Sequence, residues 1–208
     1  MKRILAVVIF PLALVSGSVF AQDLGMSFED AAYVSCLDTQ AMPRENRVRF
    51  AVALVKRASN FYGLPYVEGG SLDSQLGTLI RAGCTVFPTA YLHNVTATAF
   101  RHATNASPPQ VPAVSPIPFE TASFLTCRQF GQMADEQQDA LEFDFAVRAG
   151  QRYGMKFEDT PSGRAKLDEG ITPLVQGTCF LTPDFHIYGV VARAVQAAIE
   201  LQKLDKPR

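Results

Sequence analysis

Four cysteines are the residues of this sequence whose type and number point most directly to chemistry. They are Cys36, Cys84, Cys127 and Cys179. No two of them form a Cys-x-x-Cys pair, the spacing typical of zinc knuckles and thioredoxin-like redox sites. An even number of cysteines in an exported chain favours structural disulfides over reactive thiols. We therefore predict two disulfides.

The N-terminus predicts that the chain is exported. Residues 1–3 give a basic start, residues 4–15 are an apolar run interrupted by one proline, and residues 19–21 fit the small-x-small pattern before a cleavage site. We interpret residues 1–21 as a secretory signal peptide. The next residue is Gln22 rather than the cysteine of a lipoprotein, so we expect no membrane anchor.

The charge composition argues against two classes of partner. The chain carries 19 Lys and Arg residues against 20 Asp and Glu residues, a formal net charge of −1. It has no basic stripe that would favour nucleic acid and no Lys-rich amphipathic segment that would favour a membrane surface.

Two stretches of the sequence are nearly the same. FEDAAYVSC ends at Cys36, and FETASFLTC ends at Cys127, 91 residues later. In both cases a Tyr-Gly pair follows 26 residues after the cysteine, and a Leu-Asp pair precedes the next cysteine by 11 residues. This regularity indicates a tandem duplication. It predicts the repeating disulfide pattern, Cys36–Cys84 and Cys127–Cys179.

The duplication also predicts the domain organisation. After the signal peptide we expect a first unit over 22–103, a Pro-rich linker over 104–118 and a second unit over 119–208. The linker holds five of the chain's 13 prolines, which favour an extended, semi-rigid backbone. The two units could pack on each other as a pseudo-dimer.

Apolar residues recur at helical spacing in three stretches of each unit. In the first unit these stretches follow Pro43, Ser71 and Pro88, with Pro88 in the first turn of its helix. The second unit repeats them near 141–147, 171–175 and 187–195. Alternation with a period of two is not sustained, so we predict an all-α fold.

The sequence offers no convincing catalytic, metal or cofactor site. His93 and His186 fall near equivalent places of the two third helices, but we interpret them as residues on the polar face of an amphipathic helix. The spacing of the histidines does not suit a metal, and no phosphate loop or nucleophile elbow is present. We therefore expect a protein that is not an enzyme and that needs no cofactor.

A group of carboxylates opens the second unit's first long helix. We interpret it as a solvated acidic helix start, since Asp and Glu suit that position, and as a candidate pH-responsive group: Asp135, Glu136, Asp139, Glu142 and Asp144. The matching stretch of the first unit is basic instead, with Arg44, Arg47 and Arg49. These two stretches could face each other across the pseudo-dimer.

The second unit resembles the HdeA/HdeB family of small periplasmic acid-stress chaperones. The resemblance rests on Thr-Cys-x-x-Phe at Cys127, on Asp135-Glu136, on Phe145-Ala146, and on the stretch ITPLVQGTC that ends at Cys179 and is followed by Pro183. The first unit keeps the cysteines but has Thr39 where the second has Phe130, and Thr78 where the second has Pro173.

The resemblance implies a function and a location. It implies a periplasmic, ATP-independent holdase that loosens in acid and binds unfolded periplasmic proteins through exposed apolar helix surface. Protonation of the carboxylates would leave the positive charges unopposed. Candidate client-binding residues are Phe50, Leu54, Phe143, Phe145 and Val147.

An alternative is a binding or inhibitor protein that acts on one specific periplasmic partner. Tyr62-Gly-Leu-Pro65, followed by Leu72-x-x-Gln75-Leu76, is weakly similar to the Rap1a/Tai type of immunity protein. In that case a rigid surface would carry the function, and acid would contribute nothing.

Overall fold

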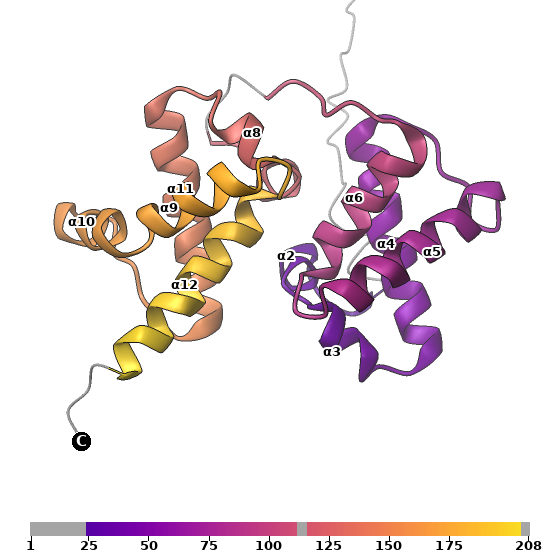
Figure 1. The fold of residues 1–208 in the computed structure, drawn as a ribbon, viewed down its shortest axis with the longest axis horizontal. Coiled ribbons are helices and arrows are strands. Elements are labelled where there is room, and N and C mark those ends of the chain that lie inside the picture. The colour runs from indigo at the N-terminus through magenta and orange to yellow at the C-terminus, as the bar shows by residue number, and fades with distance from the viewer. Residues whose placement is uncertain (1–23, 112–115, 205–208) are drawn as a thin grey trace, which may run out of the picture.

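The computed structural model describes residues 24–111 and 116–204. The predicted signal peptide and residues 112–115 of the predicted linker lie outside these ranges. The described residues form eleven α-helices and no β-strand, which confirms the all-α prediction. Figure 1 shows that the helices form two groups, one at each side of the molecule.

We call the N-terminal group the first bundle. Its helices are α2 (Phe28–Ala32), α3 (Cys36–Gln40), α4 (Arg44–Tyr62), α5 (Ser71–Val86) and α6 (Leu92–Thr104). The C-terminal group, the second bundle, contains α7 (Phe119–Ala122), α8 (Cys127–Phe130), α9 (Asp135–Tyr153), α10 (Pro161–Gly170), α11 (Thr172–Leu181) and α12 (Ile187–Leu204). The short helix α2 lies on the side of the first bundle that faces the second (Figure 1).

The same local devices fix the helices of both bundles. Helix α3 begins with a capping box between Ser35 and Asp38, and α8 with one between Thr126 and Gln129. The long helices α4 and α9 are capped at their C-terminal ends by Gly63 and Gly154, which adopt the left-handed conformation with φ of 65° and 83°. These glycines belong to the repeated Tyr-Gly pairs of the sequence.

Both predicted disulfides are confirmed. Cys36 is bonded to Cys84 and Cys127 to Cys179, with Cα–Cα distances of 5.3 and 5.1 Å. Each bond joins a short helix, α3 or α8, to the C-terminal half of α5 or α11. Each bundle is therefore closed covalently within itself.

The two bundles differ in shape where the second contains a proline. Helix α5 is continuous, whereas the corresponding stretch of the second bundle divides into α10 and α11 at Ile171. Pro173 has no backbone N–H to donate and favours the start of a new helix, while Thr78 at the matching place of α5 allows the helix to continue. The helix that packs beside α4 therefore differs in shape from the pair of helices that packs beside α9.

Candidate functional site

Aromatic side chains from both bundles meet in one buried layer. We call this layer the seam and define it by four residues of each bundle: Phe28, Tyr33, Tyr91 and His93 from the first, and Phe119, Phe124, His186 and Tyr188 from the second. All eight are buried. Because such rings bury large apolar areas, the seam is a major source of contact between the bundles.

The seam contacts come in matched pairs. Phe28 and Phe119 occupy equivalent positions 91 residues apart and touch each other, with ring centroids 6.0 Å apart. Phe28 also stacks on Phe124 at 6.5 Å, and the exchanged contact, Tyr33 on Phe119, has 6.1 Å. The bundles thus present equivalent surfaces to each other, as in a twofold dimer.

The residues at the starts of α6 and α12 supply the other four side chains of the seam. The exchange of one bundle for the other relates these residues as well. Isolated bridges pair Ser35 with Tyr91 and Thr126 with His186, so Tyr91 and His186 hold equivalent positions. The first bundle therefore reads Tyr-Leu-His where the second reads His-Ile-Tyr. Across the seam, His93 faces His186 with centroids 6.2 Å apart, and Tyr91 faces Tyr188 at 5.9 Å.

Both seam histidines are sealed from solvent. The exposed fractions of His93 and His186 are 0% and 3%. Within the described chain, neither ring nitrogen of His93 and not Nε2 of His186 finds a hydrogen-bond partner. The interpretation of these histidines as residues of a solvated helix face was therefore wrong.

Burial lowers the pKa of both histidines to about 3. Removal from water is the largest cause, because it disfavours the charged imidazolium. For His93 the neighbouring His186 adds to this effect, and the positive charge of Arg57 contributes slightly. The backbone of Ser123 acts in the opposite direction and raises the pKa of His93. The contact does not meet the geometry of a normal hydrogen bond to either ring nitrogen.

A neighbouring arginine also opposes the protonation of His186. Arg101 lowers the pKa of His186, and its guanidinium lies 3.9 Å from the Asp184 carboxylate. Besides His186, the rings around His93 are apolar or phenolic, namely those of Phe28, Phe124 and Tyr188. Among the described residues, the charged side chains that act on the two imidazoles are Arg57 and Arg101, and both are cationic. The seam therefore offers no counter-charge for an imidazolium.

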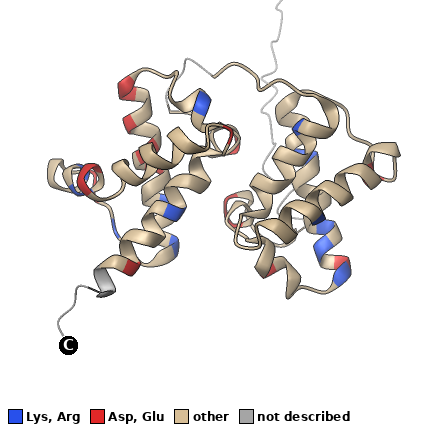
Figure 2. Ribbon diagram, in the orientation of Figure 1, with Lys and Arg blue, Asp and Glu red and all other residues tan. Residues whose placement is uncertain are grey.

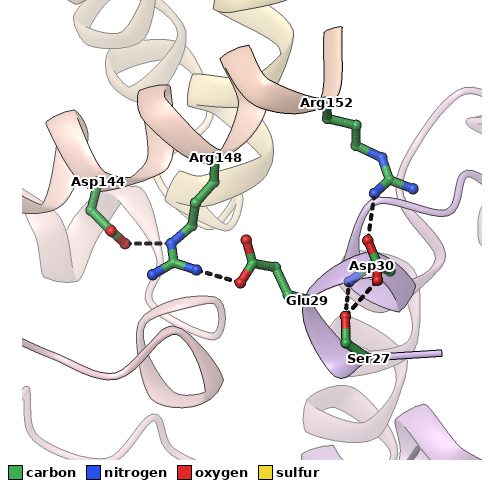
Figure 3. Close-up of polar contacts among 6 residues, drawn as sticks. All are labelled: Ser27, Glu29, Asp30, Asp144, Arg148 and Arg152. Atoms are coloured by element: carbon green, nitrogen blue, oxygen red, sulfur yellow. Dashed lines mark hydrogen bonds and ion pairs between the residues drawn. The ribbon is translucent and has the colours of Figure 1, made fainter. Parts of the chain in front are cut away.

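Ion pairs border the seam on one side. Arg148 of α9 bonds the carboxylates of Glu29 and Asp144, and Arg152 bonds Asp30 at 3.2 Å (Figure 3). The guanidinium of Arg148 also lies 5.1 Å from the centre of the Phe119 ring. The pairs with Glu29 and Asp30 join α9 of the second bundle to α2 of the first, while the pair with Asp144 lies within α9.

Two hydrogen bonds made by tyrosine hydroxyls tie the bundles together. The hydroxyls of Tyr91 and Tyr153 are 2.7 Å apart, and Tyr188 donates to the carbonyl of Ala32 at 2.8 Å. Gly189 allows this close approach, because a Cβ there would lie 2.3 Å from the amide nitrogen of Asn94. Polar and apolar contacts therefore both hold the closed arrangement.

The candidate client-binding residues do not gather on one surface. Phe50, Leu54 and Phe145 are buried, and the ring of Phe145 contacts the seam through Phe119 and Tyr188. Phe143 is half-buried under the guanidinium of Arg164, at 4.4 Å. Val147 is likewise half-buried.

The candidate pH-responsive carboxylates divide into three kinds. Asp135, Glu136 and Asp139 are exposed, and Asp144 pairs with Arg148. Glu142 is buried, with 5% exposed, and accepts a hydrogen bond from Thr172 at 2.7 Å.

Burial raises the pKa of Glu142, although the Thr172 hydroxyl opposes this. The folded state thus holds the proton more tightly than the unfolded state does. Acidification stabilises the fold through Glu142, which is opposite to an acid trigger.

The expected contact between the Arg-rich and acid-rich stretches is not what joins the bundles. Figure 2 shows acidic positions along the first half of α9 and basic positions along α4, on opposite bundles. Within the described residues, the ion pairs between bundles use Arg148, Arg152 and Arg101 instead.

Sequence reasoning missed the seam, although its signal was present. The repeated stretches keep an aromatic residue at Phe28 and Phe119 and another at Tyr33 and Phe124. We used these stretches as markers of repetition and not as a contact surface. Aromatic positions that recur in both repeats are candidates for the surface where the two units contact each other.

Three further observations describe the molecule. Among the described residues, His, Cys, Asp and Glu do not form a group of three or more that could hold a metal ion. In the same residues, no helix has the length and apolar character needed to cross a membrane. Comparisons of the chain with protein-family models, curated proteins and solved structures found no match.

Proposed function

We propose that this chain is a periplasmic, ATP-independent acid-stress chaperone whose two bundles separate in acid. At neutral pH each bundle covers the aromatic surface of the other. In acid the seam opens and its rings bind unfolding client proteins. The observation that supports this proposal most is that two histidines from opposite bundles are buried next to each other in the seam.

The linkage between proton binding and closure has the required sign. The pKa of each histidine is about 3 in the closed form, whereas the ordinary pKa of an imidazole in water is about 6.5. The open form therefore takes up protons first as the pH falls. The histidines leave closure unopposed above about pH 6.5, and they weaken it progressively between pH 6.5 and 3.

The size of the effect is sufficient to open a small protein. At pH 4 each histidine weakens the closed form by about 3 kcal/mol, given about 1.4 kcal/mol for each pH unit. The whole free energy of unfolding of a small domain is about 5–15 kcal/mol. Two histidines that titrate together can therefore shift the balance toward the open form.

The covalent structure suits reversible opening. Each disulfide lies within one bundle, so it limits unfolding of that bundle and leaves the bundles free to part. Because both bundles belong to one chain, closure on return to neutral pH does not depend on protein concentration. We attribute this arrangement to duplication of an HdeA/HdeB-like unit, which turns a dimer into a single chain.

A client-protection assay tests this function. A model enzyme is brought to about pH 3 and then neutralised, with and without the disulfide-intact chain 22–208, while light scattering records aggregation. We expect the chain to suppress scattering near stoichiometric amounts. The control variant His93→Leu/His186→Leu, whose seam cannot take up these protons, should protect less. Equal aggregation with and without the chain would contradict the proposal.

A rigid binding or inhibitor module is the second candidate. Three large apolar side chains near the end of α11 are already exposed in the closed form, namely Phe180 (86%), Leu181 (77%) and Phe185 (49%). Such a patch is typical of a surface that binds another protein. This candidate predicts capture of one periplasmic partner at neutral pH, loss of capture in Phe180→Ser, and no protection of clients in acid.

A further inference from the structure

A groove of about 790 Å³ opens on the first bundle. The helices α4 and α5 supply most of its lining, and none of the eight seam residues contributes. Its apolar side chains are Val48, Val52 and Val55 of α4 with Leu76 and Ile80 of α5. The groove is therefore a second candidate site, separate from the surface that would open in acid.

Three arginines line the same groove. Arg44 and Arg47 stand in the first turn of α4, and Arg81 stands on α5 one turn before Cys84. The disulfide of Cys84 ties this part of α5 to α3, and only residues 41–43 connect α3 to α4. Arg44 and Arg47 thus lie at one end of the groove, whereas the guanidinium of Arg81 turns back along α5 and donates to the Thr78 hydroxyl at 3.3 Å.

These arginines carry charge without a counter-charge. Among the described residues, the ion pairs do not include Arg44, Arg47 or Arg81. The other end of the groove has the opposite character, because the Tyr66 hydroxyl and the backbone N–H of Gly69 bond the Asp73 carboxylate there. A ligand with an anionic group would be oriented with that group toward the arginines.

The second bundle shows that the groove is not a necessary result of the fold. The matching place between α9 and α10 holds only about 70 Å³. Leu167 and Ile171 are buried there, and acidic residues replace apolar ones: Asp139 stands where the first bundle has Val48, and Glu142 where it has Ala51. The open, basic groove is therefore a property of the first bundle's own residues.

We infer that this groove binds a single-chain anionic amphiphile, namely a long-chain carboxylate, with its head at the arginines and its alkyl chain along the apolar walls. The volume suits a small ligand, since such sites usually measure about 300–1,000 Å³. Arginine pairs well with carboxylate. The inference does not depend on the proposed chaperone function.

Isothermal titration calorimetry at neutral pH tests the inference, with dodecanoate kept below its micellar concentration as the probe. We expect saturable binding of one molecule to each chain 22–208. Arg44→Gln/Arg47→Gln should weaken binding at least about tenfold, because it removes charge-assisted hydrogen bonds. Lys56→Gln/Arg128→Gln removes the same charge from exposed sites outside the groove lining and should leave binding unchanged.

A second variant tests the apolar wall. Val48→Asp introduces the residue that the second bundle has at this place, and Val48 is exposed enough for the fold to accept it. It should weaken dodecanoate binding while the helical circular dichroism is retained.

Four results would overturn the inference. They are no saturable binding, equal affinity for the uncharged dodecyl maltoside, no loss in Arg44→Gln/Arg47→Gln, and dimerisation of the free chain that Val48→Asp abolishes. The last result would mean that a second copy of the chain covers the groove.

Discussion

His93 and His186 approach each other from opposite bundles, with their ring centroids 6.2 Å apart, and both are buried. The exchange that relates the bundles maps this pair onto Tyr91 and Tyr188, which are 5.9 Å apart. Burial raises the pKa of both tyrosines and lowers that of both histidines. Only the histidine side of the seam can therefore take up protons when the pH falls.

Arg148 is expected to hold the border of the seam. Arg148→Met keeps the apolar stem but removes the bonds to Glu29 and Asp144 and the cation–π contact with Phe119. We expect the free energy of unfolding, measured with urea, to fall by about 1–2 kcal/mol at low salt and by less in roughly 1 M NaCl.

The matched control for Arg148 is Lys56→Met. Lys56 pairs with Glu68 at an exposed site within the first bundle. This change should cost below roughly 0.5 kcal/mol. Equal losses in the two variants would mean that the ion pairs at the border contribute nothing particular to closure.

The hydrogen bond between Tyr91 and Tyr153 should couple the bundles. We expect Tyr153→Phe to lower the free energy of unfolding by about 1 kcal/mol, since a buried hydroxyl loses its partner. Tyr91→Phe/Tyr153→Phe should cost less than the sum of the two single changes. A double-mutant cycle measured with urea gives the coupling energy, and a value of zero would show that the bond does not stabilise the closed form.

Glu142→Gln should stabilise the protein at neutral pH. The folded state raises the pKa of Glu142, so ionisation above that pKa costs stability, and an amide removes the cost while still accepting the Thr172 hydrogen bond. The gain should vanish in acid, where the wild-type carboxyl is protonated. Urea unfolding at pH 7 and pH 4 measures this, with exposed Asp135→Asn as the control. A loss at pH 7 would contradict the assigned direction.

Each disulfide should stabilise its own bundle. The bonds close loops with sequence separations of 48 and 52 residues, which corresponds to about 4 kcal/mol each in the chain-entropy model. Cys36→Ala/Cys84→Ala and Cys127→Ala/Cys179→Ala should therefore lose similar amounts in thermal unfolding. If only one variant lost stability, the two bundles would not depend on their disulfides in the same way.

Much of the fold could be predicted from local signals. The repeated cysteine spacing gave the correct disulfides, and helical periodicity gave the long helices. The two bundles differ where Pro173 divides α10 from α11, and this proline was visible in the sequence. Short helices such as α2 and α7 have four or five residues, too few to show a periodic pattern.

The start of α6 could not be predicted from its own residues. We expected Pro88 in the first turn, but the helix begins at Leu92. The carbonyls of Pro88 and Ala90 accept hydrogen bonds from Leu37 and Cys36 at 2.8 and 2.9 Å, which holds this stretch extended against α3. A tertiary contact from a distant segment therefore set the boundary.

The same contact explains why the histidines were misinterpreted. The carbonyl of Val34 accepts from Leu92 at 2.8 Å, and the carbonyl of Leu125 accepts from Ile187 at 2.9 Å. These bonds fix the first turns of α6 and α12 beside the repeated aromatic stretches and direct His93 and His186 into the seam. Periodicity within a single helix shows its apolar face, but not a second buried face formed by another bundle.

A pH titration of near-ultraviolet circular dichroism tests the central claim, that protonation of the seam histidines opens the seam. It compares the disulfide-intact wild type, His93→Leu/His186→Leu, and the exposed-histidine control His102→Leu between pH 7 and 2. We predict that the wild type and His102→Leu lose the tyrosine and phenylalanine signal as the pH falls from 6.5 toward 3, and that the double variant keeps it to a pH lower by at least about one unit. The claim is contradicted if the wild type keeps its signal below pH 3, or if the double variant loses its signal at the same pH as the wild type.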